Sequence, residues 1–378
     1  MKFVIAIDSF KGSLTSMEAG EAAEKGIKRV FPDADTVIRP IADGGEGTVD
    51  ALTEGLSGEK QTVRVTGPLG ESVEAVYGII NNDTAVIEMS AAAGITLVSD
   101  KDRNPMNTTT YGVGEIIIDA VKKGCRNFIV GIGGSATNDG GIGMLQALGF
   151  GMLDEAGEQV PFGAKGLGKI KKITDNGIFS KLSGCSFNIA CDVTNPLCGN
   201  NGCSAVYGPQ KGADKKMIAD MDKDLFEYAR LTKAIRPEAD ENTPGAGAAG
   251  GIGFAFLAYL GGKLKNGIEL ILRETDIEKE ISDADFVITG EGRLDSQTVM
   301  GKVPVGVASL AKKYNKPVIA FSGCVTDEAR ICNQHGIDAF FPIVRSACSL
   351  QEAMDTDNAY KNLADTAEQV MRIIKIKN

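Results

Sequence analysis

Residues 2–30 read KFVIAIDSFKGSLTSMEAGEAAEKGIKRV, and this stretch decides the fold class. Residues 2–7 form a continuous apolar run, which is typical of a strand that helices cover on both faces. Thr15 and Glu18 have the spacing of a capping box, and apolar residues at helical spacing follow them up to Val30. A buried strand followed by an amphipathic helix predicts the start of a parallel α/β sheet.

The same alternation continues to about residue 56 and resumes near the C-terminus. Each further strand is again a short apolar run between helical patterns, as in a sheet with two covered faces. We expect strands at 36–42, 286–289, 317–321 and 339–343, and helices ending near 56 and spanning 303–314, 326–335 and 358–375.

The middle of the chain has a different pattern. Residues 61–66 and 71–80 alternate like an antiparallel hairpin around a turn at 67–70, and further strands are expected at 84–89, 128–132 and 187–190. We therefore predict an α/β protein with two domains. A discontinuous Rossmann- or flavodoxin-like parallel-sheet domain is expected from residues 1–64 plus 284–378, with a mixed α/β domain, 65–283, inserted into it.

The composition and net charge of the chain indicate which classes of partner to expect. The chain has 378 residues and a formal net charge of −10, which argues against nucleic acid or an anionic membrane surface as a main partner. The apolar run at the N-terminus is too short for a signal peptide, and no stretch reaches the length of a membrane span, so we expect a cytoplasmic protein. We expect it to be a monomer or a homodimer. The only histidine, His335, stands just before Gly336 and is interpreted as a helix cap, which disfavours histidine-dependent nucleophilic catalysis.

A glycine-rich tract, GIGGSATNDGGIG at 131–143, follows an apolar run and precedes a helical pattern. A strand that ends in such a turn and opens a helix predicts backbone N–H groups ready for an anion such as phosphate. No Walker A loop occurs. The tract does contain the alanine variant of the dinucleotide fingerprint, with Asp154 as a candidate ribose ligand, and 245–250 is a second weak match. Asn138 and Asp139 fit a nucleotide accompanied by Mg²⁺ better than a bare dinucleotide.

Three acids follow predicted strands of one sheet: Asp8, Asp43 and Glu291. Because the carboxyl ends of parallel strands meet at one edge, where ligands bind in open α/β sheets, we expect these acids to lie together. Three carboxylates would repel one another without a cation, and Mg²⁺ prefers such oxygen ligands. Lys11, three residues after Asp8, is expected to neutralise phosphate. The alternative for each loop is ordinary helix capping.

Asp192 follows another predicted strand and is held near Pro196 in the segment CDVTNPL, 191–197. A carboxylate in this place is a candidate to accept a proton from a substrate hydroxyl. Local turn formation by the Asn-Pro pair explains the same segment equally well, and both interpretations stay open.

Six long motifs then resemble one known family. They are 8–16 (DSFKGSLTS), 42–48 (ADGGEGT), 131–141 (GIGGSATNDGG), 191–197 (CDVTNPL), 245–253 (GAGAAGGIG) and 289–298 (TGEGRLDSQT). In this order and nearly end to end, the chain resembles the bacterial type-1 glycerate kinase family. The resemblance implies transfer of a phosphoryl group from ATP to D-glycerate, with the 2-hydroxyl as the expected acceptor, by two α/β domains with a cleft between them.

On this basis we assign hypothetical roles. Mg²⁺ would be placed by Asp8, Asp43 and Glu291. Lys11 and Arg293 would hold transferring phosphate or the glycerate carboxylate, and Asp192 or else Asp295 would act as the base. The ATP phosphates would contact Gly133, Gly134, Ser135, Thr137, Asn138, Asp139, Gly140 and Lys302. The alternatives are a dinucleotide-dependent oxidoreductase acting on a small hydroxy acid and a non-catalytic nucleotide sensor.

Overall fold

The computed structural model describes residues 1–377 and divides into two compact units. Unit 1 combines residues 1–43, 50–57 and the chain from 267 onward, and unit 2 combines 44–49 and 58–266. Each unit has its own parallel or mixed sheet and its own buried core. The α/β class with two α/β units, predicted from the alternation of strands and helices, is therefore confirmed.

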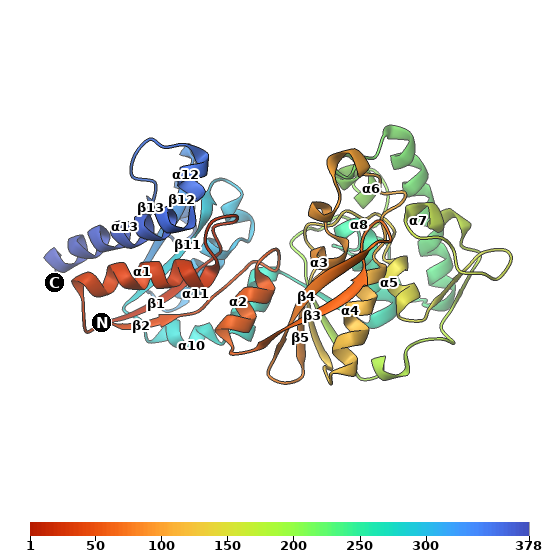
Figure 1. Ribbon diagram of the computed structural model, residues 1–378, viewed down its shortest axis with the longest axis horizontal. Coiled ribbons are helices and arrows are strands. Elements are labelled where there is room, and N and C mark those ends of the chain that lie inside the picture. Colours follow the sequence, from red (N-terminus) through yellow and green to blue (C-terminus); the bar gives the residue numbers. More distant parts are fainter. Residues whose placement is uncertain (378) are drawn as a thin grey trace. The chain divides into compact units, whose positions relative to one another are not determined.

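Unit 1 is built on a five-stranded parallel sheet in the order β13-β12-β11-β1-β2 (Figure 1). Its strands are β1 (Lys2–Ile7), β2 (Asp35–Ile38), β11 (Phe286–Leu294), β12 (Val318–Val325) and β13 (Ala339–Pro342). Counted within the unit, this is the flavodoxin-like order 2-1-3-4-5. The strand order reverses between β1 and β11, and in such sheets the crevice at the carboxyl ends of those two strands is where ligands bind.

Helices cover both faces of this sheet. On one face α1 (Ser16–Val30) packs against α13 (Thr356–Lys377), and apolar side chains of both helices meet the strands in one core. On the other face α11 (Val303–Lys313) contacts β1, β11 and β12. The remaining elements of the unit are α9 (Gly267–Glu274), α10 (Ile277–Ser282), η6 (Thr298–Met300), η7 (Asp327–His335) and α12 (Leu350–Met354), and α2 (Thr48–Gly55) crosses from unit 2 into unit 1.

Unit 2 contains a six-stranded mixed sheet in the order β10-β9-β6-β5-β4-β3. The strands are β3 (Glu59–Thr66), β4 (Ser72–Ile80), β5 (Thr84–Glu88), β6 (Asn127–Gly131), β9 (Ser186–Ala190) and β10 (Lys263–Lys265). The predicted hairpin is present as the antiparallel pair β3 and β4, while β5, β6, β9 and β10 run parallel.

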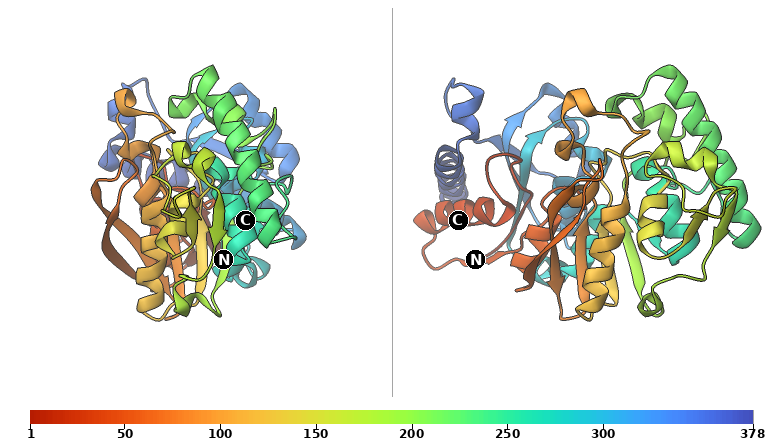
Figure 2. Two further views of the ribbon diagram at one scale, coloured as in Figure 1. Left: turned by 90° about the vertical axis from the view of Figure 1, so that its right-hand side faces the viewer. Right: turned by 45° about the vertical axis from the view of Figure 1, so that its right-hand side comes forward.

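Two groups of helices pack on the unit 2 sheet (Figure 2). The α4 helix (Tyr111–Lys122) contacts β3 and β4, and α8 (Ala248–Leu260) contacts β9 and β10. Smaller elements complete the unit: α3 (Ser90–Ala93), η1 (Ile95–Leu97), η2 (Asp100–Asp102), α5 (Ile142–Ala147), β7 (Gly151–Leu153), η3 (Ala164–Lys169), β8 (Lys172–Thr174), η4 (Ser180–Leu182), α6 (Cys203–Tyr207), η5 (Pro209–Lys211) and α7 (Lys215–Ile235).

The observed units begin and end at other residues than the predicted domains. The first division falls at 57/58 rather than 64/65, because β3 pairs along its whole length with β4. The second falls at 266/267 rather than 283/284, because α9 and α10 pack against α11 of unit 1. Periodicity could not locate these boundaries because it does not reveal which neighbour an element packs on.

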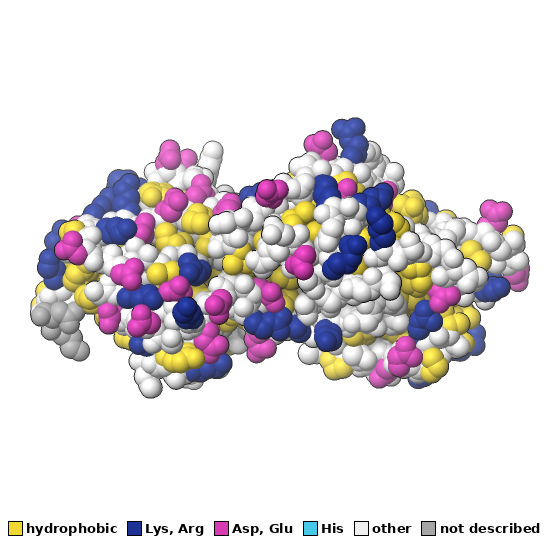
Figure 3. All heavy atoms as spheres, turned by 90° about the horizontal axis from the view of Figure 1, so that it is seen from below, with side chains coloured by type: hydrophobic (Ala, Val, Ile, Leu, Met, Phe, Trp, Pro, Cys, Tyr) yellow, Lys and Arg dark blue, Asp and Glu magenta, His cyan; other side chains and the backbone are white. Residues whose placement is uncertain are grey.

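Two further observations concern membranes and the distribution of charge on the surface. Within the described residues, no helix combines the length and the apolar composition needed to cross a bilayer. On the face drawn in Figure 3, basic and acidic side chains are interspersed.

Candidate active site

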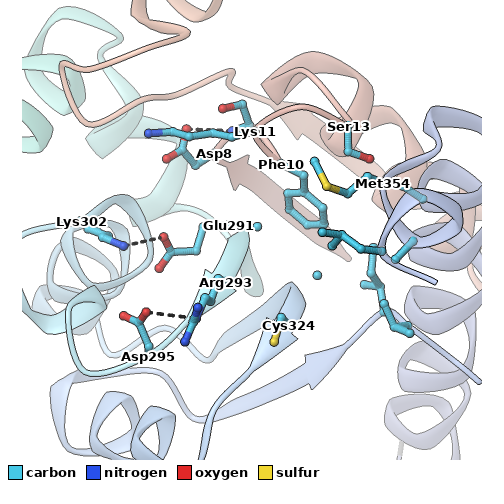
Figure 4. Close-up of a pocket in the computed structure, with 18 of the residues that line it drawn as sticks. Asp8, Phe10, Lys11, Ser13, Glu291, Arg293, Asp295, Lys302, Cys324 and Met354 are labelled. Carbon is cyan, nitrogen blue, oxygen red and sulfur yellow. Dashed lines mark hydrogen bonds and ion pairs between the residues drawn. The ribbon is translucent and has the colours of Figure 1, made fainter. Parts of the chain in front are cut away.

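A pocket of about 550 Å³ lies in unit 1. It is lined by the loops after β1, β11 and β13, by the last residues of β11 and β12, and by helix α12. It has a charged end and an apolar end, which Figure 4 shows on opposite sides. The charged end is lined by Asp8, Lys11, Asp43, Glu291, Arg293, Asp295 and Lys302. The apolar end is lined by Phe10, Ile343, Val344, Leu350, Ala353 and Met354. All three acids that were predicted to meet at the sheet edge thus line one pocket.

Strand register and one buried hydroxyl bring the acids together. Ile7 pairs with Gly290 in the parallel ladder, and the Asp8 N–H donates to the carbonyl of Gly290 at 2.9 Å. The buried hydroxyl of Ser16 donates to the Ile7 carbonyl at 2.5 Å and accepts from the Ile41 N–H at 2.8 Å. This single side chain therefore ties the end of β1 to the segment that carries Asp43, although β2 itself ends five residues earlier, at Ile38.

Asp8 is 4% exposed, and its environment disfavours the carboxylate. Burial, followed by the nearby charge of Asp43, raises the pKa of Asp8 to about 8. The Ser9 N–H, which donates to Oδ1 at 2.7 Å, and the charge of Lys11 act in the opposite direction but more weakly. A cation bound next to Asp8 would therefore stabilise its ionised carboxylate.

Glu291 lies inside β11, which continues to Leu294 by pairing with β12, so the prediction that the strand stops at residue 289 was wrong. Its side chain accepts from Thr298 Oγ1 at 2.6 Å and pairs with Lys302 Nζ at 3.4 Å. Burial raises the pKa of Glu291, while Thr298 and Lys302 oppose that shift.

The prediction of a three-carboxylate metal site needs correction. Among the described residues, no three His, Cys, Asp or Glu side chains are grouped so as to hold a metal ion. The physical reason is visible at Glu291, whose two oxygens are already engaged by Thr298 and Lys302. Because Mg²⁺ needs only one or two protein carboxylates, Asp8 and Asp43 stay candidate ligands.

Arg293 and Asp295 form an ion pair with 3.3 Å between Nε and Oδ2. The Arg293 side chain is largely exposed, and Asp295 Oδ1 also accepts from the Gln297 N–H at 2.8 Å. Both residues line the pocket, and their contact with a ligand stays a prediction.

The glycine-rich turn of unit 2 differs from the predicted phosphate cradle. The Asp139 side chain is completely buried and accepts from the backbone N–H groups of Gly141 at 3.0 Å and Gly143 at 3.3 Å. It also accepts from the N–H and the hydroxyl of Thr110, each at 2.9 Å. The amides that open α5 are thus held by an acid of the chain itself.

Burial separates the predicted contacts of this turn into two groups. The side chains of Thr137, Asn138 and Asp139 have no exposed surface, and Gly140 is also buried, where its N–H donates to the carbonyl of Gly250. These four residues cannot contact a nucleotide in this arrangement. Gly133 and Gly134 are exposed and Ser135 lies at the boundary, so only this part of the turn can meet a ligand.

Lys211 is a residue of interest that sequence reasoning missed. It is 2% exposed, and its Nζ donates to Ser135 Oγ at 2.9 Å and to the Thr137 carbonyl at 2.5 Å. Burial lowers the pKa of Lys211 to about 8. Because Ser135 Oγ accepts from Lys211, the hydroxyl proton of Ser135 is left to donate elsewhere. Its neighbours in sequence, Gln210 and Gly212, suggest only a loop, so no local signal could have identified it.

The other candidates of unit 2 have structural partners. Asp192 follows β9, is exposed, and accepts from Asn266 Nδ2 at 2.9 Å. Asp154 accepts from the N–H groups of Ala156 and Glu158 and so shapes a turn. At Gly250, with φ +73°, an added Cβ would lie 2.0 Å from the Thr137 carbonyl, so this glycine is explained by close backbone packing.

Comparisons with known proteins agree over the whole chain. Residues 3–375 match the model of a family described as the glycerate kinase family. The chain is 48% identical to a glycerate 2-kinase of Escherichia coli K12, covering 100% of this chain and 98% of that one. It is 47% identical to a glycerate kinase of Haemophilus influenzae over all of both chains. A solved structure from Salmonella typhimurium LT2, described as a candidate glycerate kinase 2, is 46% identical, with a TM-score of 0.92 and coverage of 100% and 99%.

Proposed function

Because the chain belongs to the glycerate kinase family, we propose that it transfers the γ-phosphoryl group of ATP to glycerate. The observation that carries this proposal within the structure is the pocket that gathers acids and cations at the strand-order switch point of unit 1. Family membership overturns the oxidoreductase alternative, since the relatives named above are kinases.

Phosphoryl transfer needs mainly positioning and neutralisation of charge. Lys11 is exposed and lines the pocket, so its ammonium can reach an entering phosphate. Lys302 is about one-third exposed and is held by Glu291, which fixes a second cation at the same end. Arg293 offers a third, planar donor that can bind phosphate or carboxylate oxygens through two hydrogen bonds.

The charged end also fits Mg²⁺. This ion takes one or two protein carboxylates and completes its shell with water and substrate phosphates, so it does not require three acids. The raised pKa of Asp8 indicates a carboxylate that lacks sufficient positive charge around it. We propose that Asp8 and Asp43 hold Mg²⁺, which when bound neutralises charge on the nucleotide phosphates. Glu291 then acts by orienting Lys302.

For the proton of the acceptor hydroxyl we retain two candidates. Asp295 is paired with Arg293, and Asp192 with Asn266, so each is already oriented by a neighbour. Comparing kcat for Asp192→Asn and Asp295→Asn distinguishes them, because loss of the base lowers kcat without an equal rise in the KM for ATP. Gly133 and Gly134, which are exposed, and Ser135, which is 8% exposed, remain candidates for contact with an anionic group.

The choice of the 2-hydroxyl of glycerate as the phosphoryl acceptor rests on the name of the Escherichia coli relative, a glycerate 2-kinase. We propose D-glycerate as the substrate and 2-phosphoglycerate with ADP as the products. A coupled assay of ADP release with D- and L-glycerate and Mg²⁺, followed by NMR of the product, tests every part. ADP release that does not depend on glycerate, or a phosphate on the 3-hydroxyl, would contradict the corresponding part.

A further inference from the structure

We infer that the apolar end of the unit 1 pocket binds the nucleobase of the nucleotide, which places the nucleotide along the β1–α1 loop. This inference rests on the proposed kinase function but goes beyond it, because neither the comparisons nor the charged end says where the base lies. In this arrangement one nucleotide fills the whole pocket, with its flat, largely apolar base at one end and its anionic phosphates at the other.

The dimensions of the pocket agree with such a ligand. A volume of about 550 Å³ falls in the range of sites that enclose whole cofactors. A three-carbon hydroxy acid would leave most of this space empty and has no apolar part to place against Phe10 and Ile343. Phosphate and Mg²⁺ likewise account only for the charged end. A nucleotide is the one reactant of the proposed reaction whose chemistry matches both ends.

Two apolar side chains at this end lack cover from the protein. Leu350 is 76% exposed and Met354 is 38% exposed, both on the short helix α12, and both line the pocket. Met354 extends over the β1–α1 loop, where a Cβ added to Gly12 would lie 2.8 Å from Met354 Cε. A bound base would remove these side chains from water, and burial of apolar surface is favourable.

One polar atom at the apolar end has no partner within the described residues. Ser13 Oγ is buried, makes no hydrogen bond, and belongs to a residue that lines the pocket. Figure 4 shows Ser13 beside Met354, on the side of the pocket away from Glu291 and Lys302. Rotation about χ1 would turn this hydroxyl toward the pocket, where an edge nitrogen or amino group of a base would supply the missing hydrogen bond.

The β1–α1 loop connects both ends. Asp8 stands at its start, in the charged end, and Ser13 lies five residues later, at the apolar end. A ligand that places its phosphates near Asp8 and Lys11 would therefore run beside this loop toward Ser13. The direction of the bound nucleotide, from its phosphates to its base, is thus given by residues 8–13 alone.

The test compares two probes that differ by the nucleoside: ADP and inorganic pyrophosphate. Calorimetry would measure the affinity of the full-length wild type, of Leu350→Gln/Met354→Gln and of Ser13→Ala for each. The matched control is Ile373→Gln, which replaces an apolar residue of unit 1 that is 63% exposed and is not among the pocket-lining residues. Thermal unfolding would establish that each variant folds.

We expect the double variant to bind ADP at least fivefold more weakly, while its affinity for pyrophosphate and its KM for glycerate stay unchanged. Ser13→Ala should lose at least twofold in affinity for ADP alone. ADP binding within fivefold of wild type in the folded double variant, or an equal loss for both probes, would overturn the inference. The outcome is separable from the proposed function: glycerate-dependent ADP release tests the reaction, whereas the difference between the two probes tests the location of the base.

Discussion

At the scale of single residues, Asp8 is an acid whose ionisation the fold opposes. Its folded-state pKa of about 8 lies above the ordinary value of 3.8, so between these values the folded protein binds more protons than the unfolded chain. The contribution of Asp8 to stability is therefore fully present below about pH 4 and is lost as the pH rises through 8. Asp8→Asn removes this dependence.

We expect the apparent Tm of Asp8→Asn, relative to wild type, to be higher at pH 8.5 than at pH 5 by at least about 2 °C, which corresponds to roughly 1 kcal/mol in a domain of this size. Differential scanning fluorimetry at both pH values measures this. A Tm difference that stays constant with pH would contradict the assigned pKa of Asp8.

The same pair of proteins tests the proposed metal ligand. Because Mg²⁺ favours the ionised carboxylate, MgCl₂ at pH 8.5 should raise the Tm of wild type more than that of Asp8→Asn. CaCl₂ at equal ionic strength separates specific binding from screening. If both proteins respond equally to MgCl₂, Asp8 is not a ligand.

Lys11 gives the sharpest prediction for catalysis. We expect Lys11→Ala to lower kcat at least a hundredfold, about 2.7 kcal/mol of barrier, because charge neutralisation is a large part of phosphoryl transfer. Its exposed position means that folding should be unaffected. Lys313→Ala, which changes an exposed lysine at the end of α11, is the control. Near-wild-type kcat in Lys11→Ala would remove this residue from the site.

At the scale of elements, the glycine-rich turn is organised by Asp139 rather than by a ligand. Four donors converge on its buried carboxylate and join the start of α4 to the start of α5. In Asp139→Asn an amide NH₂ would face some of these donors, so we expect a loss of at least about 2 kcal/mol, or about 4 °C in Tm.

Asp154→Asn is the matched control for this substitution. Asp154 also accepts two backbone N–H groups, but it is only half-buried and begins an exposed turn. Its Tm should fall by less than half as much. Equal Tm values for Asp139→Asn and wild type would show that the carboxylate is not the organiser of the turn.

At the scale of the whole molecule, the proposed nucleotide site lies in unit 1, at the point where the flavodoxin-like strand order reverses. Hydrogen exchange with and without ADP therefore should show protection in segments 8–15 and 343–354, which carry the two ends of the pocket. The hairpin of β3 and β4 is an internal reference. Protection confined to 131–143 would place the nucleotide at the glycine-rich turn instead.

The sequence by itself determined the features that depend on local periodicity and on motif order. The strand at 2–7, the capping box at Thr15, the hairpin of unit 2 and the pairing of chain ends in one parallel sheet follow from apolar spacing and turn residues. The sequence also predicted that Asp8, Asp43 and Glu291 lie at one edge of the sheet, and all three line the same pocket.

Only the tertiary structure decided the rest, because burial and partners arise from segments distant in sequence. Asp139 reads as an exposed acid on a glycine loop, yet packing from α4 encloses it. The sequence around Lys211 does not indicate a functional residue, and its interest comes from its hydrogen bond to Ser135, which lies 76 residues away in sequence. Leu350 and Met354 carry no signal of a binding site in their own segment, but the fold leaves both side chains exposed to solvent and lining a pocket.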